Sequence, residues 1–477
     1  MTEYEIVVGL EIHCQINTKT KMFCRCSNDS FNEAPNLNVC PVCMGFPGQL
    51  PVINAEAVKK GVIAGLALNC NIPRFSKFDR KNYFYPDSPK GYQISQYDKP
   101  VAENGEVIVE TSQGEKRIGI TRLHLEDDAG KLTHTPAGTL CDFNRAGTPL
   151  MEIVSDPDIR SIEEASNYAR EIQKIMRYVH SSDADMEKGM MRFDLNISLR
   201  PMGTNSYGTK VEIKNLNSFQ ALEKAMEYEI KRQTKELEAG NSISQETRGW
   251  NDIENKTVSQ RSKEEANDYR YFPEPDLPPL ICEQDMVEAL RQEFVGELPY
   301  QKRQRFQKEF LLSAEEIRIL TESRAMADFF EQANSIANNP KTVASFVTTI
   351  LLKFLNEHEL SLTDSKITAI HIGELVKAID EGTISNNTAK TTVFEAMFET
   401  GDLPAKIIEQ KGLKQVSDTG LIEELCKKAI DANPKAIEDY KSGNEKALGA
   451  LVGFIMKESK GQANPGLVNQ TLKNLLD

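Results

Sequence analysis

Glu11 and His13 are the first residues of the chain whose types and spacing could do chemistry. They lie two positions apart in EIVVGLEIHCQI, where apolar residues occupy every second position from Val8 to Ile16. Alternation at period two is typical of a half-buried β-strand and places both side chains on the same face. A strand face that meets only water would carry Thr, Lys or Ser. Carboxylates with an imidazole are instead suitable ligands for a divalent cation.

Three further stretches with strand patterns carry an acid on their polar face. RLHLEDD contributes Glu126, PLMEIVS contributes Glu152 and MRFDLNISLR contributes Asp194. With Glu11 and His13, these acids predict one polar sheet surface that presents ligands for Mg²⁺, an ion that prefers oxygen. Such an ion neutralises transferring phosphate groups and orients a nucleophile. A simpler interpretation stays open for each acid alone, because antiparallel sheets commonly have one solvated polar face.

Four cysteines are clustered in FCRCSNDSFNEAPNLNVCPVC. Cys24 and Cys26 form a CxC pair, and Cys40 and Cys43 form a CxxC pair after thirteen intervening residues. Two short thiol pairs can close a tetrahedral Zn²⁺ site. Four thiolates leave no position for water or substrate, so the predicted zinc site is structural. The alternative is four small buried hydrophobic residues, which free cysteines often are.

The segment DRKNYFYPD combines basic and aromatic side chains. Arg80 and Lys81 precede Tyr83, Phe84 and Tyr85. Basic residues interleaved with aromatic ones can hold a phosphate and stack a nucleobase. A hairpin whose aromatic residues pack into the core would explain the same pattern.

Composition restricts the class of protein. The 477 residues are 39% hydrophobic and 27% charged, as in globular proteins, and are too many for a single core. Apolar runs are shorter than the ~20 residues of a membrane span, and the N-terminus has no basic n-region, so we expect a cytosolic protein. A net charge of −14 argues against nonspecific coating of nucleic acid. Gly130-Lys131 is not a P-loop, because Leu125 and Leu132 replace the required glycine and Ser/Thr.

The pattern of elements predicts three domains. Residues 1–295 mix strands and helices and predict an α+β body with a mixed or antiparallel sheet. Residues 296–404 and 405–477 have only helical patterns and predict two all-α domains, a middle helical domain and a tail. The tail holds 11 basic and 10 acidic residues, a net charge of +1, whereas the rest of the chain carries −15.

Several helices can be placed within these domains. Ser161 to His180 and Ser218 to Leu237 repeat apolar residues at helical spacing. Ser161 with Glu164, and Ser313 with Glu316, have the spacing of a capping box at a helix start. In the tail, Lys446, Lys457 and Lys460 can cluster around one helix, a feature that favours contact with phosphates.

Longer motifs identify a family. VGLEIH, KFDRKNYFYPD, KGYQISQ, RLHLEDDAGK, DFNRAGTPLMEIVS, KNLNS and DYRYFPEPD occur in this order and closely resemble the B subunit of aspartyl/glutamyl-tRNA(Asn/Gln) amidotransferase, the GatB family. GFIMKESKGQANPGLVNQ resembles the tail domain of that family. The resemblance extends over essentially the whole chain, and the four-cysteine knuckle resembles the version found in only some members.

The resemblance implies a function for the polar surface. Members use ATP to phosphorylate the side-chain carboxylate of misacylated Glu-tRNA(Gln), and often Asp-tRNA(Asn), and ammonia then displaces phosphate. The resemblance implies two partners in a heterotrimer, namely a glutaminase (the A subunit), which makes the ammonia from glutamine, and a small chain (the C subunit). Phosphoryl transfer depends on positioning and charge neutralisation, which suits acids and Mg²⁺ on an open sheet. The sequence is compatible with glutamyl, aspartyl or both substrates.

Motif positions also carry over candidate site residues. The resemblance implies that the catalytic and Mg²⁺-binding residues are Glu11, His13, Glu126, Glu152 and Asp194. Arg80 and Lys81 are implied to contact phosphates of ATP or of the tRNA acceptor end. The body would be a cradle that holds the site, and the two helical domains would grip the tRNA. The alternative is a non-catalytic zinc-knuckle RNA-binding adapter, which would leave the acids on several strands unexplained.

Overall fold

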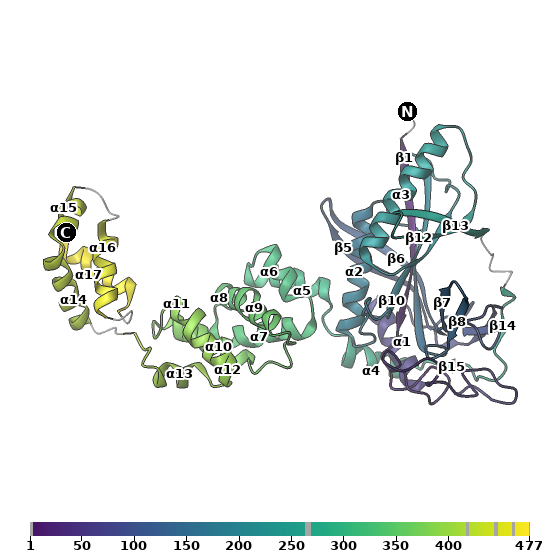
Figure 1. Cartoon of the computed structure of the whole chain (residues 1–477), viewed down its shortest axis with the longest axis horizontal. Helices are drawn as coiled ribbons and strands as arrows, with labels where there is room; N and C mark the ends of the chain where they lie inside the picture. Colours follow the sequence, from purple (N-terminus) through teal and green to yellow (C-terminus); the bar gives the residue numbers. More distant parts are fainter. Residues whose placement is uncertain (1–2, 263–268, 416–418, 443–446, 460–462, 477) are drawn as a thin grey trace. The chain divides into compact units, whose positions relative to one another are not determined.

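The computed structural model describes residues 3–262, 269–415, 419–442, 447–459 and 463–476. They divide into two compact units, Met1–Gln301 and Lys302–Asp477. The first unit is built on an eight-stranded sheet, and the second is helical throughout its described residues (Figure 1). The predicted α+β body followed by a helical region is therefore confirmed.

The large sheet has the strand order β13-β12-β11-β10-β1-β9-β6-β5. Its strands are β1 (Tyr4–Gln15), β5 (Ala102–Thr111), β6 (Gly114–Asp127), β9 (Pro149–Ser155), β10 (Met191–Pro201), β11 (Val211–Leu216), β12 (Glu246–Asn251) and β13 (Lys256–Ser262). The pairing of β11 with β12 is parallel, and the other pairings are antiparallel, so the sheet is mixed. The first strand of the chain thus lies inside the sheet, between β9 and β10.

Small sheets and short segments complete the first unit. β3 (Asp79–Asn82) pairs with β4 (Tyr92–Ser95) and β14 (Phe272–Pro273). β2 (Phe75–Ser76) pairs with β15 (Leu280–Ile281), and β7 (Lys131–Thr135) forms a hairpin with β8 (Gly138–Asp142). α4 (Gln284–Leu290) and the π-helical turn η2 (Arg291–Val295) follow β15. These elements surround one end of the large sheet.

One face of the large sheet is buried under helices. α1 (Ala55–Ala67), α2 (Ile162–Tyr178) and α3 (Phe219–Glu238) pack against it (Figure 1). The strand residues that face these helices alternate along the chain, as period two requires, and are almost completely inaccessible: Leu10, Ile12, Leu123, Leu125, Met151, Ile153, Phe193, Leu195, Val211 and Ile213. The other face is consequently left for the polar residues.

The helix starts follow the sequence closely. Ser161 caps α2 and accepts the backbone N–H of Glu164, while Ser218 caps α3 in the same way. The capping box at Ser313 is complete. At Ser161 it is not, because the Glu164 carboxylate accepts the backbone N–H of Arg160 at 2.8 Å. The predicted helices are confirmed, and one capping box is reduced to a single cap.

The second unit contains two hydrophobic cores among its described residues. Its helices are α5 (Pro299–Phe310, which begins in the first unit), α6 (Ala314–Leu320), α7 (Arg324–Ala337), α8 (Pro340–Ser345), η3 (Phe346–Leu351), α9 (Leu352–Glu357), α10 (Ala369–Asp380), α11 (Asn386–Thr388), η4 (Ala389–Val393), α12 (Phe394–Thr400), α13 (Pro404–Gln410), α14 (Thr419–Ala432), α15 (Pro434–Lys441), α16 (Leu448–Glu458) and α17 (Pro465–Leu476). One core runs from Phe306 to Ile408 and the other from Ile422 to Leu472.

The structure describes one of the three tail lysines that are predicted to contact phosphates. Lys457 lies in α16, whereas Lys446 and Lys460 lie outside the described residues. Among the described helices, none is long and apolar enough to cross a membrane.

Candidate active site

Two histidines flank a glutamate across three neighbouring strands. His13 on β1 lies directly opposite Glu152 on β9, and Glu152 lies directly opposite His124 on β6. The Nε2 atoms of His13 and His124 are 3.3 Å and 3.4 Å from Oε2 of Glu152. The antiparallel register therefore aligns three polar side chains in one row, and all three are buried.

Glu126 completes this group from the position two residues beyond His124 on β6. Its Oε2 atom is 3.5 Å from Nε2 of His124 and accepts a hydrogen bond from the Ser95 hydroxyl at 3.1 Å. His13, Glu126 and Glu152 each offer one ligand atom, and the three atoms lie within 4.8 Å of one another. His13 Nδ1 is buried and has no hydrogen-bond partner among the described atoms. Two carboxylates and an imidazole with an unused nitrogen fit a divalent cation.

The charges in this group stabilise one another. Burial alone would raise the pKa of Glu152, but the His124 and His13 imidazoles outweigh it and hold that pKa well below its usual range. Burial alone would lower the pKa of His124, yet the carboxylates of Glu152 and Glu126 raise it to about 9. Glu152 is therefore an anion at neutral pH, the state in which a carboxylate binds a metal.

Glu11 and Asp194 form a second acidic pair beside the first group. They lie opposite each other on β1 and β10. The Asn196 amide donates a hydrogen bond to Glu11 at 2.8 Å, and Nζ of Lys214 is 3.0 Å from an Asp194 oxygen. Burial, with the nearby charges of Glu152 and Asp194, raises the pKa of Glu11. Five residues, four acids and one imidazole, were predicted for this site. The structure gathers His13, Glu126 and Glu152 into one group that could hold a metal, and it places Glu11 and Asp194 next to that group.

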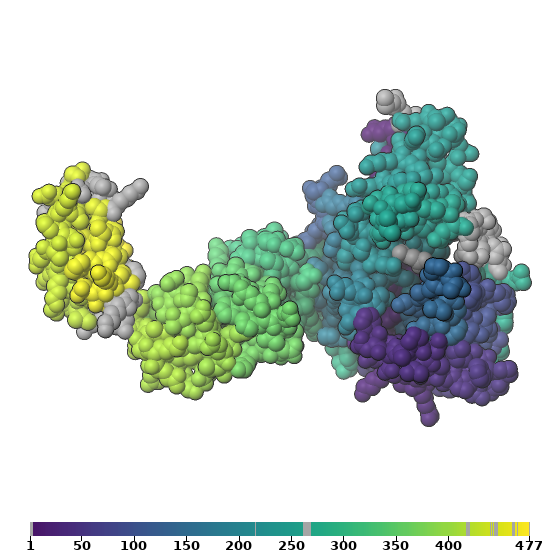
Figure 2. All heavy atoms as spheres, in the orientation of Figure 1, coloured from purple at the N-terminus to yellow at the C-terminus, as the bar shows by residue number. Residues whose placement is uncertain are grey.

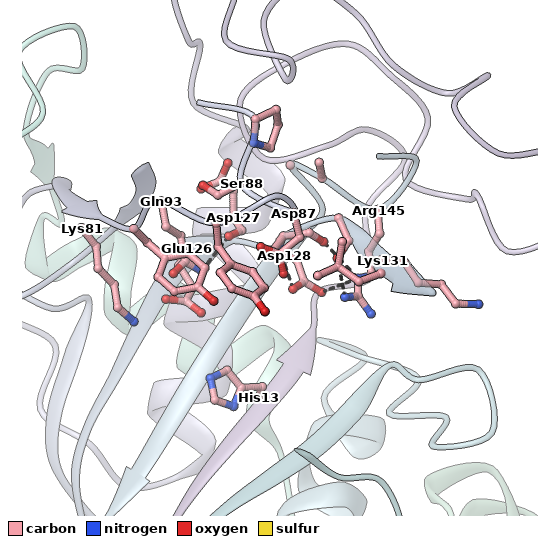
Figure 3. Close-up of a pocket in the computed structure, with 18 of the residues that line it drawn as sticks. His13, Lys81, Asp87, Ser88, Gln93, Glu126, Asp127, Asp128, Lys131 and Arg145 are labelled. Atoms are coloured by element: carbon pink, nitrogen blue, oxygen red, sulfur yellow. Dashed lines mark hydrogen bonds and ion pairs between the residues drawn. The ribbon is translucent and has the colours of Figure 1, made fainter. Parts of the chain in front are cut away.

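His13, Glu126 and Asp194 line a cleft of about 920 Å³, whereas Glu152 and Glu11 are the cross-strand neighbours of His13 and Asp194. Figure 3 shows His13, Lys81 and Glu126 around one part of it, and Asp87, Asp128, Arg145 and Lys131 around another. Its lining also includes Tyr83, Tyr85, Gln93, Arg192, Asp194, Lys214 and Tyr269. Acids, bases and aromatic rings thus meet in one space large enough for a nucleotide-sized ligand.

Asp128 anchors one wall of the cleft. Its carboxylate lies 3.2 Å from Arg192 and 3.4 Å from Arg145, and it accepts the backbone N–H of Ala129 at 2.9 Å. Burial works to raise the pKa of Asp128, but the two guanidinium groups lower it to about 2. Arg145 also donates to the carbonyl oxygens of Ala129 and Gly130, which fixes the turn that follows β6.

The two basic residues of DRKNYFYPD point to different surroundings. Arg80 donates two hydrogen bonds to Glu274, at 2.7 Å and 2.9 Å, and lies over the ring of Tyr92. Lys81 lines the cleft, and its Nζ lies 5.0 Å from the centre of the Tyr269 ring. Burial would lower the pKa of Lys81, but Glu126 and other anions raise it above its usual value, so it carries a positive charge in the cleft.

The four cysteines converge on one point. The Sγ atoms of Cys24, Cys26, Cys40 and Cys43 lie within 4.8 Å of one another. The Sγ atoms of Cys40 and Cys43 are 3.8 Å apart, the edge length of a tetrahedron with Zn–S bonds of about 2.3 Å. Hydrogen bonding from Cys24 lowers the pKa of Cys43 to about 5, against the effect of burial. The donor set and its spacing fit a closed Zn²⁺ site.

Sequence reasoning missed His124, Arg192 and Lys214 as residues of the site. Each lies two positions from an acid on the same strand: Glu126, Asp194 and Glu212 respectively. The period-two pattern therefore places them on the polar face, but it indicates no role for them there. Ser95 and Asp87 come from distant segments, and no local pattern relates them to the sheet.

Similarity to known proteins extends over nearly the whole chain. Residues 6–288 match the family model described as GatB/GatE catalytic domain, and residues 328–476 match the model described as GatB domain. The chain is 51% identical over 475 residues to the B subunit of the aspartyl/glutamyl-tRNA(Asn/Gln) amidotransferase of Caldanaerobacter subterraneus subsp. tengcongensis, covering 99% of both chains. It is 51% identical over 482 residues to the protein of the same name from Carboxydothermus hydrogenoformans, covering 100% of this chain and 99% of the other. The candidate site lies within the first matched segment, and the chain belongs to the GatB family, that of the B subunit of aspartyl/glutamyl-tRNA(Asn/Gln) amidotransferase.

Proposed function

We propose that this chain is the kinase and amidating subunit of a glutamine-dependent tRNA amidotransferase, a carbon–nitrogen ligase of protein biosynthesis. Its reaction would be the ATP-dependent conversion of misacylated Glu-tRNA(Gln), Asp-tRNA(Asn) or both into the amide, in the cytoplasm. The observation that carries this proposal is the convergence of His13, Glu126 and Glu152 beside a cleft that also holds Lys81. Phosphoryl transfer needs positioned charges of this kind.

We infer the following roles for residues in the cleft and next to it. His13, Glu126 and Glu152 would hold Mg²⁺, with Glu11 and Asp194 beside them. When bound, Mg²⁺ neutralises charge on the transferring phosphoryl group. Lys81 would place a positive charge where phosphate oxygens lie. Arg80, which is bound to Glu274, would support the same wall from behind. Tyr83, Tyr85 and Tyr269 offer aromatic faces for stacking a base at the cleft.

The remaining assignments concern partners and domains. We infer that the glutaminase supplies ammonia from glutamine, that the small C subunit completes the heterotrimer, and that Cys24, Cys26, Cys40 and Cys43 hold a structural Zn²⁺. We infer three domains, with limits at 1–295, 296–404 and 405–477. The body would carry the chemistry, and the helical domain and the tail would bind tRNA.

ATP hydrolysis by the assembled heterotrimer tests the proposed function against the adapter alternative. The heterotrimer should form ADP when it is given Glu-tRNA(Gln) or Asp-tRNA(Asn), glutamine and Mg²⁺, and the tRNA-bound amide should appear with it. Correctly charged Gln-tRNA(Gln) is the control and should not stimulate ADP formation. A heterotrimer that binds the misacylated tRNAs but neither hydrolyses ATP nor amidates would instead establish an RNA-binding adapter.

Removing the tail should weaken tRNA binding without causing the heterotrimer to dissociate. A chain that ends at Gln415 keeps Ile407 and Ile408 in the core that runs from Phe306 to Ile408, and it loses the core that runs from Ile422 to Leu472. We expect its affinity for tRNA to fall at least about tenfold at moderate salt, because the tail would contribute phosphate contacts. Electrophoretic mobility shift measures the affinity, and gel filtration with the glutaminase and the small chain checks assembly.

Lysine substitutions provide a matched control in the full chain. Lys435, Lys457 and Lys473 form no ion pair with the described residues, whereas Lys427 and Lys428 pair with Glu423 and Glu424 one helical turn away. Glutamine at the first three should reduce both the affinity and its salt dependence. Glutamine at the paired two should have a smaller effect. Unchanged tRNA affinity in the truncated chain would assign the tail a purely structural role.

A further inference from the structure

Lys21 is a lysine with no exposed surface at all. It lies between the end of β1 and Cys24. Its ammonium donates a hydrogen bond to the carbonyl oxygen of Asn38 at 2.8 Å and lies 3.9 Å from Sγ of Cys43. Among the residues that the structure describes, no carboxylate lies within ion-pair distance of it. A buried ammonium is strongly unfavourable unless an anion accompanies it.

Cys43 is the group that can supply this anion. The backbone makes room for the contact at Gly147, which has a φ of +89°. A Cβ atom at this position would lie 3.3 Å from Cβ of Cys43 and 3.4 Å from Cδ of Lys21. The absence of a side chain at Gly147 thus lets the ammonium and the sulfur come together inside the fold.

The charge of a metal-bound cluster matches this requirement. Four thiolates around Zn²⁺ carry a net charge of −2, which a single ammonium reduces to −1. We propose that Lys21 is the counter-cation of the four-cysteine site and that it positions Cys43 as a thiolate ligand. The inference rests on the proposed structural Zn²⁺. Groups behind the ligands that donate to them commonly tune metal affinity.

The surroundings of Lys21 connect the cluster to the cleft. Asn38, whose carbonyl oxygen accepts from Lys21, donates its backbone N–H to the Asn144 side chain at 2.8 Å. Gly147 donates its N–H to the carbonyl oxygen of Asp128 at 2.9 Å. In Figure 2 a large purple segment, from the early part of the chain that follows β1, lies at the surface of the body beside the blue hairpin β7–β8. Loss of the cluster would therefore loosen the wall that carries Asp128.

Zinc retention tests the role of Lys21. Lys21→Met keeps a long side chain and removes the charge, and Lys19→Met, at an exposed position nearby, is the matched control. The full-length wild type should contain one zinc per chain by elemental analysis. Lys21→Met should transfer zinc to a chelator at least about tenfold faster than wild type, the scale of losing a group that supports the ligands, and Lys19→Met should match wild type. Equal rates for all three would overturn the role of Lys21, while a wild type without zinc would overturn the zinc site itself.

A second background keeps the proposal testable if Lys21→Met folds poorly. Serine at all four cysteine positions removes both the metal and the thiolates, and leaves Lys21 without an anion. In this background Lys21→Met should raise the midpoint of thermal unfolding, whereas in the zinc-loaded wild type it should lower it. Such a reversal of sign identifies an interaction between two groups rather than packing alone. A decrease in both backgrounds would show that Lys21 acts through its hydrocarbon chain and its hydrogen bond to Asn38, and not through the cluster.

Discussion

Glu152→Gln is expected to lower the rate of ATP-dependent amidation by about a hundredfold or more, the scale of losing a strong electrostatic contact to transition-state charge. Glutamine has nearly the same size but cannot be an anion. It would remove the central charge that both His13 and His124 approach, and with it a carboxylate ligand of the possible metal group. The measurement is amide formation on Glu-tRNA(Gln) by the heterotrimer.

Two controls separate the loss of chemistry from the loss of structure. Glu5 lies on the same strand as His13, but it pairs with Arg200 and Arg160 outside the cleft. Glu5→Gln should therefore leave the amidation rate within about twofold of wild type, because substitutions away from a site change little. Glutaminase activity assayed directly should persist in both variants. A titration with Mg²⁺ should rescue Glu152→Gln only in part. If Glu152→Gln amidates at the wild-type rate throughout that titration, the row of histidines and glutamate is scaffold.

Asp128→Asn is expected to destabilise the body by about 3–5 kcal/mol at neutral pH, the cost of breaking a buried ion pair by removing one partner. The variant would leave Arg145 and Arg192 in the wall of the cleft without their shared anion. Urea unfolding followed by circular dichroism measures the loss. Asp29→Asn, at an exposed position, is the control and should shift stability by no more than about 0.5 kcal/mol.

The stability lost in Asp128→Asn should depend on pH, and the direction of this dependence follows from the pKa of Asp128. The folded-state pKa of Asp128, about 2, lies below its ordinary value of 3.8. The stability that comes from this depression is complete above the unfolded value and is lost as pH falls through the folded one. The difference in free energy of unfolding between wild type and Asp128→Asn should therefore stay constant from about pH 5 upward. It should be smaller by about 1 kcal/mol at pH 3. A difference that does not change with pH would mean that Asp128 is not ionised in the folded protein.

The fold could be predicted to the extent that local periodicity determines it. Alternation identified β1, β6 and β10, serine caps placed α2 and α6, and apolar residues at helical spacing placed α3, because these signals depend on neighbours within a few turns or one pleat. The order of strands could not be obtained in this way. β1 lies between β9 and β10, and this pairing depends on contacts between residues that are far apart in the sequence.

The candidate site, too, could be predicted only as far as local periodicity determines it. The polar face of each strand, with Glu11, His13 and Glu126, was readable from single strands. Which of these residues converge depends on register, which brings His13 and His124 to the same carboxylate of Glu152 and leaves Glu11 with Asn196. The hydrogen bonds from Arg80 to Glu274 could not be predicted either, because the two residues are far apart in the sequence and meet through the pairing of β3 with β14.

The central position of β1 has a consequence for synthesis of the protein. Tyr4 pairs with Pro201 and Gln15 with Leu150, so β1 leaves the ribosome long before either neighbouring strand exists. At about 5–20 residues per second, roughly 10–40 s pass before the β1–β10 pairing can form. During this interval Val8, Leu10 and Ile12, which are inaccessible in the fold, are exposed on an unpaired strand. The strand that carries Glu11 and His13 is thus a segment of the nascent chain that a chaperone would need to protect.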